Sequence, residues 1–348
     1  MSTHLMELPR KILIGHGVIK DLGNFVTDLG MRKVAVVSGA VVKVRAGEQC
    51  HESLSKSGLE DTWFLATAPN MEAVDVIQKE IVKNGSEAII GFGGGKSVDV
   101  AKTVAYNLNR PFVSVPTSAS HDGISSPFSS IKGHDKPYSI KTKTPIGVLA
   151  DTSIIAGAPK RLLAAGCGDL MAKVTAVKDW ELARDEKGEY FGKYSSNLAF
   201  MSAKIIMEES KSIGTGGVAS VRTVVEALIS SGVAACIADS SRPCSGAEHL
   251  FSHALDFIAP NKGLHGEKCG IGAIMMAKLH DIEWEQISSK LKYIGAPTTA
   301  KEIGIDTDSI VKALVAACTL RPERYTILNK ISLKEWNALE LAKSTGVI

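Results

Sequence analysis

The chain has 348 residues, more than one hydrophobic core usually serves, so its length favours two domains over a single large barrel. Its 45% hydrophobic and 22% charged content is that of an ordinary globular protein and excludes intrinsic disorder. Forty basic and 37 acidic residues leave a formal charge of +3, which excludes the strong basic field typical of nucleic-acid-binding proteins.

The sequence predicts a cytoplasmic protein without an integral membrane segment. Its unbroken apolar stretches are much shorter than the ~20 residues of a membrane helix, and its start lacks the layout of a signal peptide. The six cysteines are spread along the chain without a CxxC pair. This spacing favours reduced, mostly buried thiols over a disulfide framework.

The first 150 residues alternate between strand and helix patterns. Strands are expected at residues 33–38, 62–66, 87–92, 111–115 and 145–149. Helices are expected at residues 40–57, 71–84 and 97–107, the second of them ending at Gly85. This alternation predicts βαβ units with right-handed crossovers, and therefore a doubly wound parallel sheet.

The pattern breaks between residues 120 and 144, where prolines, glycines and lysines predict a surface loop or hairpin. Four lysines of this stretch might contact a phosphate, but a solvated hairpin explains them better: Lys132, Lys136, Lys141 and Lys143. After Pro159 the segments are helical nearly throughout, for example at residues 168–184, 197–209, 220–238, 247–257 and 267–280. We therefore expect an α/β domain at residues 1–157 and an all-α domain at residues 158–348.

A glycine-rich turn lies between the third predicted strand and the next helix. Gly93, Gly94 and Gly95 let backbone N–H groups approach a ligand, and the following helix N-terminus attracts a pyrophosphate. The turn matches neither GxGxxG nor the P-loop pattern. The alternative is a tight turn in which Ser97 caps the helix and Asp99 favours its dipole. The strand–turn–helix context favours ligand binding.

A polar loop, Thr117-Ser-Ala-Ser-His-Asp-Gly123, follows the next predicted strand. Ligands of open parallel sheets bind beyond the carboxyl ends of the strands, where this loop is expected to lie. A turn whose side chains bond to their own backbone explains the same residues equally well. The sequence leaves these two interpretations open.

The helical half carries a candidate metal site. Asp169 is expected at the start of a helix, His249 and His253 share one helical face, and His265 just precedes another helix. One carboxylate and two imidazoles with a vacant position match the ligand count of a catalytic metal site. Each residue alone is explained by a helix cap or an ordinary histidine. The clustering of three histidines within seventeen residues favours a metal, and helical spacing alone pairs His249 with His253.

These segments together resemble the polyol-dehydrogenase superfamily of iron-dependent alcohol dehydrogenases, glycerol dehydrogenase and 3-dehydroquinate synthase. Within it, the chain is most similar to the archaeal sn-glycerol-1-phosphate dehydrogenases. The matching segments span nearly the whole chain, in the same order: residues 8–10, 93–102, 116–123, 150–169, 246–255, 263–270 and 321–328, the last reading RPERYTIL.

The resemblance implies a role for individual residues. It assigns the dinucleotide contacts to Gly95, Lys96, Ser97, Val98, Asp99, Thr117, Ser118, Ala119, Ser120 and Ser126. It makes Asp169, His249 and His265 the zinc ligands, and Asp122, Asp169 and His253 the substrate contacts, with Asp169 and His253 catalytic. The pairing of His249 with His265 thus differs from the pairing that helical spacing alone suggests.

The resemblance also implies a fold and an activity. The expected architecture is a Rossmann-like N-terminal domain and a helical C-terminal domain with a cleft between them, in a homo-oligomer. The expected reaction is the zinc-assisted reduction of dihydroxyacetone phosphate to sn-glycerol 1-phosphate by NADH or NADPH, which supplies the glycerol backbone of archaeal ether phospholipids. The alkoxide would receive its proton from His253 or from a metal-linked water chain.

Three other functions fit parts of the same pattern. They are a glycerol or other alcohol dehydrogenase, a lyase resembling 3-dehydroquinate synthase, and a dinucleotide-sensing module without catalysis. Weak selectivity between NADH and NADPH is also expected, because no carboxylate stands at Ser38, Gly39 or Ala40 to repel a 2′-phosphate. Lys43 and Arg45 follow closely, and solvated helix residues explain them better than phosphate ligands.

Overall fold

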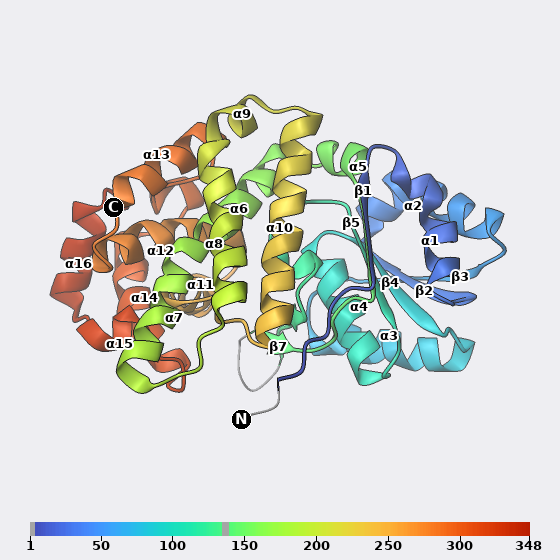
Figure 1. The fold of residues 1–348 in the computed structure, drawn as a ribbon, viewed down its shortest axis with the longest axis horizontal. Coiled ribbons are helices and arrows are strands. Elements are labelled where there is room, and N and C mark those ends of the chain that lie inside the picture. The colour runs from blue at the N-terminus through green and yellow to red at the C-terminus, as the bar shows by residue number, and fades with distance from the viewer. Residues whose placement is uncertain (1–3, 134–138) are drawn as a thin grey trace. The chain divides into compact units, whose positions relative to one another are not determined.

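The computed structural model describes residues 4–133 and 139–348, and the chain divides into two compact units, Met1–Pro159 and Lys160–Ile348 (Figure 1). The first unit contains an open parallel sheet, and the second is helical. The predicted fold class, an α/β half followed by an all-α half, is confirmed.

A six-stranded sheet in the order β1-β8-β5-β4-β2-β3 forms the centre of the first unit, and all its neighbouring strands are parallel (Figure 1). Its strands are β1 Lys11–Gly15, β2 Lys33–Ser38, β3 Glu60–Leu65, β4 Ala88–Gly93, β5 Phe112–Pro116 and β8 Gly147–Asp151. Five of them were predicted to within two residues. The strand β1 was not predicted, because it is an edge strand whose residues are exposed or only half-buried, so that its sequence pattern lacks a clear apolar face.

The helices of this unit cover both faces of the sheet. They are η1 Val18–Asp21, α1 Leu22–Asp28, α2 Ala40–Lys56, α3 Met71–Asn84, α4 Gly95–Asn107, η2 Asp122–Ile124 and α5 Thr152–Ala156. Val34 and Val36 of β2 pack in one core with residues of α1 and α2, whereas Ala35 and Val37 pack in the other with residues of α3 and α4. Successive strand residues therefore face opposite cores, as in a doubly wound sheet.

Local sequence signals begin and end α3 as predicted. The Asn70 side chain accepts a 3.0 Å hydrogen bond from the backbone N–H of Ala73, which caps the helix start. At the other end, Gly85 adopts the left-handed conformation with a φ of 73°. A side chain with a Cβ would be strained there, so this glycine stops the helix.

The irregular segment after β5 contains a short antiparallel pair, β6 Phe128–Ser129 with β7 Ile140–Lys141. This pairing agrees with the predicted hairpin. Of its lysines, Lys132 and Lys141 are exposed, and Lys143 donates a 3.0 Å hydrogen bond to Asn109. Lys136 lies outside the described residues.

The second unit consists of helices packed on one another. They are α6 Lys160–Met171, α7 Lys173–Lys187, α8 Lys193–Glu208, α9 Ser210–Thr215, α10 Val218–Ala238, α11 Ala247–Ile258, α12 His265–Leu279, α13 Trp284–Ile294, η3 Lys301–Ile303, α14 Thr307–Leu320, α15 Ile327–Ile331 and α16 Glu335–Ser344. Helix α12 packs against α6, α11 and α13, and α11 also packs against α14. Helix α12 therefore lies at the centre of this bundle.

Helix α10 is long and apolar enough to cross a membrane, a feature that the search for unbroken apolar runs did not reveal. In its most apolar 18-residue window, 67% of the residues are buried inside the protein. An apolar helix of this kind serves equally well as the core of a helical unit.

The predicted helix at residues 168–184 is wrong in its bounds. The structure has two helices instead, α6 and α7, which meet at Ala172, and Asp169 lies in the last turn of α6 rather than at a helix start. Gly166 and Gly168 are poor helix formers by intrinsic propensity. Both are fully helical here, and Asp169 therefore does not cap an N-terminus.

Asp151 links the start of the first unit to the end of its sheet. Its buried carboxylate accepts hydrogen bonds from the backbone N–H groups of Gly17 (3.1 Å), Ile19 (2.8 Å) and Ser153 (2.9 Å). Burial opposes its ionisation, but the hydrogen bonds, the Ser153 hydroxyl first, outweigh this and lower the pKa of Asp151.

We expect Asp151→Ala to destabilise the protein by about 3 kcal/mol at pH 7, because it leaves several backbone donors without an acceptor. Since the folded pKa of Asp151 is lowered, the carboxylate stabilises the fold above the unfolded pKa and stops doing so as pH falls through the folded value. Urea unfolding at pH 7 and at about pH 3 measures both effects. Asp151→Asn, the control, should retain part of the stability but lose its pH dependence; an equal midpoint for Asp151→Ala and wild type would contradict the prediction.

Candidate metal centre and dinucleotide site

The sheet of the first unit has a topological switch point between β2 and β4. From β2 the chain passes through α2 to β3 on one side, and from β4 through α4 to β5 on the other. The two strands are neighbours, with Ser38 opposite Phe92. Nucleotides bind in the crevice at such a point, outside the carboxyl ends of the strands.

Two helices begin at this point, and each follows a glycine. Gly39 precedes α2 and Gly94 precedes α4, both in extended conformation. A Cβ at Gly93 would lie 2.6 Å from Ser97 Oγ, and one at Gly95 only 2.1 Å from His121 Nε2. A Cβ at Gly93 or Gly95 would therefore displace the Ser97 or His121 side chain. The glycines that precede the two helices offer no side-chain cap to the first N–H groups.

The loop after β5 lies against the glycine turn. Thr117 donates its backbone N–H to the carbonyl of Gly93 at 2.9 Å, and a Cβ on Gly94 would lie 3.1 Å from Ser118 Oγ. The two segments nominated for the dinucleotide thus lie side by side. Among the nominated side chains, Ser120 and Asp122 are half-buried and Lys96 is exposed, and those buried are Ser97, Val98, Asp99, Thr117, Ser118, Ala119 and Ser126.

A buried ion pair holds this loop in place. Lys102, fully buried on α4, donates hydrogen bonds of 2.7 Å to the carbonyls of both Gly123 and Phe128. Asp99 lies 3.8 Å from Lys102 Nζ and accepts the backbone N–H of Ser130 at 3.2 Å. Burial raises the pKa of Asp99, and the Lys102 charge opposes that shift. In this structure Asp99 therefore organises the loop.

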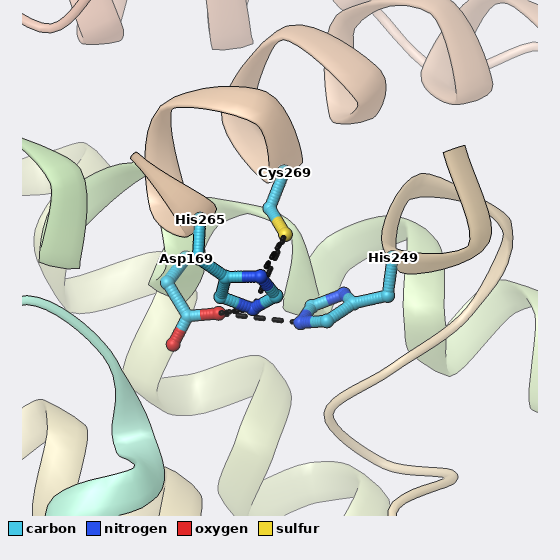
Figure 2. A group of neighbouring side chains, drawn as sticks. All are labelled: Asp169, His249, His265 and Cys269. Carbon is cyan, nitrogen blue, oxygen red and sulfur yellow. Dashed lines mark hydrogen bonds and ion pairs between the residues drawn. The ribbon is translucent and has the colours of Figure 1, made fainter. Parts of the chain in front are cut away.

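In the second unit, three helices bring four donor side chains together. Asp169 comes from α6, His249 from α11, and His265 and Cys269 from α12, and Figure 2 shows the four pointing toward one another. Their donor atoms all lie within 4.8 Å of one another. Asp169 Oδ1 is 3.3 Å from His249 Nε2 and 3.9 Å from His265 Nε2. Three of the four are buried, and His265 is partly exposed.

Glycines at the crossing of α6 and α12 make this convergence possible. A Cβ on Gly168 would lie 2.3 Å from the carbonyl oxygen of Gly266, and one on Gly266 would lie 1.9 Å from that of Ala165. The two backbones therefore touch directly. Asp169 and His265, each next to one of these glycines, face each other as a result.

Glu248 orients His249 from the side opposite Asp169. Its carboxylate lies 2.8 Å from His249 Nδ1, while its own position is fixed by the Thr175 hydroxyl at 2.8 Å and the Gly246 N–H at 2.6 Å. With Nδ1 donating its proton to Glu248, Nε2 faces Asp169, and it would offer a lone pair to a metal once its own proton is lost. Carboxylate-bound histidines of this kind are typical of metal sites.

Lys173 balances the charge of Asp169. The ammonium group is fully buried and donates to Asp169 Oδ1 at 3.0 Å. Burial alone would raise the pKa of Asp169, but the charge of Lys173, followed by the hydrogen bond and charge of His249, holds that pKa well below its ordinary value. The carboxylate is therefore ionised, as a metal ligand must be.

His253 lies beside the cluster without joining it. Its ring centroid is 5.9 Å from that of His265, and its Nδ1 lies 3.9 Å from Asp256. Burial lowers its pKa, and the nearby Asp256 carboxylate opposes the shift. Among the described residues, the group with metal-ligand geometry contains His249 and His265, whereas helical spacing alone paired His249 with His253.

The donor set fits a divalent metal. Ligands about 2.0–2.1 Å from a tetrahedral zinc lie roughly 3.3 Å apart, close to the 3.3 and 3.9 Å found here. Cys269, Glu248 and Lys173 were not predicted as site residues from the sequence. Their only signals are short-range: Cys269 follows His265 by one helical turn, and Lys173 follows Asp169 in the same way.

Comparison with known proteins gives the family. The model of the iron-containing alcohol dehydrogenase family matches residues 13–159. A glycerol-1-phosphate dehydrogenase (NAD(P)+) of Cenarchaeum symbiosum is 55% identical over 348 residues, which cover 100% of this chain and 98% of the relative. One of Nitrosopumilus maritimus is 52% identical over 349 residues, with the same coverage. The chain belongs to the glycerol-1-phosphate dehydrogenase family.

Solved structures share the fold of this family member at low sequence identity. Glycerol dehydrogenase from Schizosaccharomyces pombe has a TM-score of 0.82 at 21% identity, covering 99% of this chain and 91% of that one. A probable glycerol dehydrogenase from Sinorhizobium meliloti has a TM-score of 0.80 at 20% identity and covers 98% of both chains. At these identities the likeness concerns the fold alone.

The α6–α12 contact predicts that Gly266→Ala reduces metal binding. Its Cβ would lie 1.9 Å from the Ala165 carbonyl, so α12 must shift and take His265 away from Asp169. We expect a stability loss of at least about 1–3 kcal/mol and a clear fall in zinc per chain after reloading. Gly270→Ala, the control on the same helix, meets the Gly168 Cα at a milder 3.2 Å and should lose less. Equal zinc content and urea midpoint in Gly266→Ala and wild type would refute this role of the contact.

Proposed function

We propose that this chain is an NAD(P)-dependent glycerol-1-phosphate dehydrogenase, which reduces dihydroxyacetone phosphate to sn-glycerol 1-phosphate for the backbone of archaeal ether phospholipids. The observation that carries the proposal is the convergence of Asp169, His249 and His265 from three helices, in a chain that matches glycerol-1-phosphate dehydrogenases over its full length. The substrate is a small phosphorylated ketone, and an oxidoreductase needs both a hydride source and a means to polarise the carbonyl.

The N-terminal domain, residues 1–157, would bind NAD(H) or NADP(H). The glycine turn and the adjoining loop support this role, since they bring uncapped N–H groups to the switch point of the sheet. We assign the contacts to residues 95–99, residues 117–120 and Ser126. Ser38 ends β2 and Gly39 follows it, so no carboxylate stands there to repel a 2′-phosphate. Both the ribose of NAD(H) and the 2′-phosphorylated ribose of NADP(H) would therefore be accepted. The bound nicotinamide supplies the hydride.

The C-terminal domain, residues 158–348, would bind the metal and the substrate. Asp169, His249 and His265 would hold one zinc ion per subunit, which as a Lewis acid polarises the substrate carbonyl. Glu248 keeps the His249 lone pair aimed at the site, and Lys173 keeps Asp169 ionised. His253 would contact the substrate together with Asp169, and Asp122, a residue of the N-terminal domain, is a further proposed substrate contact.

His253 is our candidate for the proton donor to the alkoxide oxygen. It is buried beside the metal ligands, and burial lowers its pKa, so its ring is neutral near pH 7. It would act as a relay, giving the proton of its N–H to the alkoxide while its other nitrogen takes one up from solvent. Asp256 faces Nδ1, a position from which it orients the ring. His253 would thus act on the substrate while leaving the metal set unchanged.

We further propose a cytoplasmic homo-oligomer. All six cysteines are free, which suits a reducing compartment. An exposed apolar stripe along α8, formed by Tyr194, Met201 and Ile205, supports self-association. The oligomer is testable by light scattering.

A direct assay tests the function. Purified protein should oxidise NADH and NADPH when dihydroxyacetone phosphate is present, and much less with unphosphorylated dihydroxyacetone, which a free-alcohol dehydrogenase would prefer. Dialysis against a chelator should abolish turnover, and zinc should restore it. Full activity in a verified metal-free sample would contradict the role of the metal. A preference for dihydroxyacetone would favour a glycerol dehydrogenase instead.

Two histidine variants separate metal binding from proton transfer. His265→Ala should lose zinc, since it removes one of three ligands, whereas His253→Ala should keep zinc and lose about 10²–10⁴-fold in rate. Elemental analysis and steady-state kinetics measure the two effects. Full zinc occupancy in His265→Ala would reverse the ligand assignment. A wild-type rate in His253→Ala would assign the proton to a water chain.

A further inference from the structure

Cys269 is a fourth donor side chain in the metal cluster. Its sulfur lies 3.5 Å from His265 Nε2, and it is completely buried. It stands one turn after His265 on α12, so the two side chains share one face of the helix and point to Asp169 and His249 (Figure 2).

Three of the distances between the four donor atoms are close to the edge lengths of a tetrahedral zinc site. A nitrogen at about 2.0 Å and a thiolate at about 2.3 Å from zinc lie roughly 3.5 Å apart, the distance found between His265 and Cys269. The oxygen–nitrogen edges from Asp169 are 3.3 and 3.9 Å, and no pair exceeds 4.8 Å. The sulfur thus lies where a fourth ligand belongs.

Burial alone does not explain this position. Cys167, on α6 two residues before Asp169, is also completely buried, yet its sulfur is not one of the clustered donors. A buried cysteine is ordinarily a small apolar residue that packs a core. Cys269 instead faces three polar donors, where an alanine would fill space without a polar atom.

We propose that Cys269 coordinates the metal in the substrate-free enzyme, which rests on the metal site proposed above. The thiol proton is released to solvent when the sulfur binds, so the site then holds one carboxylate, two imidazoles and one thiolate. Because such a set is complete for zinc, dihydroxyacetone phosphate competes with Cys269 for the fourth position. A thiolate also favours zinc over iron at a site whose other ligands suit both metals.

Cobalt(II) is the probe that tests the proposal, because a thiolate bound to cobalt gives a near-ultraviolet charge-transfer band and carboxylate or imidazole does not. The metal-free full-length protein is titrated with cobalt(II), and spectra are recorded for wild type, Cys269→Ser, Cys269→Ala and the control Cys167→Ser. We expect the band in wild type and Cys167→Ser and its loss in both Cys269 variants. Adding dihydroxyacetone phosphate to wild type should weaken it.

Zinc affinity gives a second readout. Competition with a chromogenic chelator should show weaker binding in Cys269→Ala by at least the 10–100-fold typical of losing a supporting group, and unchanged binding in Cys167→Ser. Stoichiometric cobalt binding to wild type without the band overturns the role of Cys269 and leaves the proposed function intact. A band that persists in both Cys269 variants overturns it too. Failure of wild type to bind cobalt or zinc overturns both proposals.

Discussion

The direct backbone contact between α6 and α12 is the constraint on which the second unit depends. Side chains normally separate packed helices by 8–10 Å, and only glycines permit a closer approach. Here Gly168 and Gly266 meet with no room for a Cβ on either. Because Asp169 and His265 are the immediate neighbours of these glycines, the spacing of the helices sets the spacing of the ligands. A change in the packing of α6 against α12 would therefore also change the geometry of the metal site.

The buried charges around the metal cluster are arranged in pairs. Asp169, an anion near a helix C-terminus, is opposed by the helix dipole as well as by desolvation, and Lys173 compensates for both. Glu248, also fully buried, pairs with His249 and receives two further hydrogen bonds. A core that served only stability would be less costly with apolar residues at these positions. The retained ions indicate a site built for chemistry.

The sequence predicted those parts of the fold whose signal is local and periodic. Buried strands such as β2 and β4 could be predicted because burial leaves a run of apolar residues in the sequence. The bounds of α3 could be predicted because Asn70 and Gly85 are typical capping residues. The half-exposed edge strand β1 shows no such pattern in the sequence. The bounds of α6 were not predicted: its Gly166 and Gly168 oppose helix formation locally, and the sequence does not display the contact that Gly168 makes with α12.

The same distinction applies to the site. Asp169, His249 and His265 were nominated by a resemblance and by residue type, and the structure brings them together. Cys269, Glu248 and Lys173 went unnoticed because a cysteine, a glutamate and a lysine on helices have ordinary explanations until their partners are known. Nothing in the spacing of Glu248 and Thr175, 73 positions apart, indicates that they are hydrogen-bonded.

The buried Lys102 has a consequence for the first unit beyond its hydrogen bonds. By tying the carbonyls of Gly123 and Phe128 to α4, it fixes the loop after β5 in the free protein. A loop already ordered before its ligand arrives loses little conformational entropy on binding. The affinity of this loop for a ligand would then depend mainly on the contacts between them, because ordering and rearranging the loop would cost little free energy. In this respect the loop differs from the flexible lids that many enzymes must first close over their substrates.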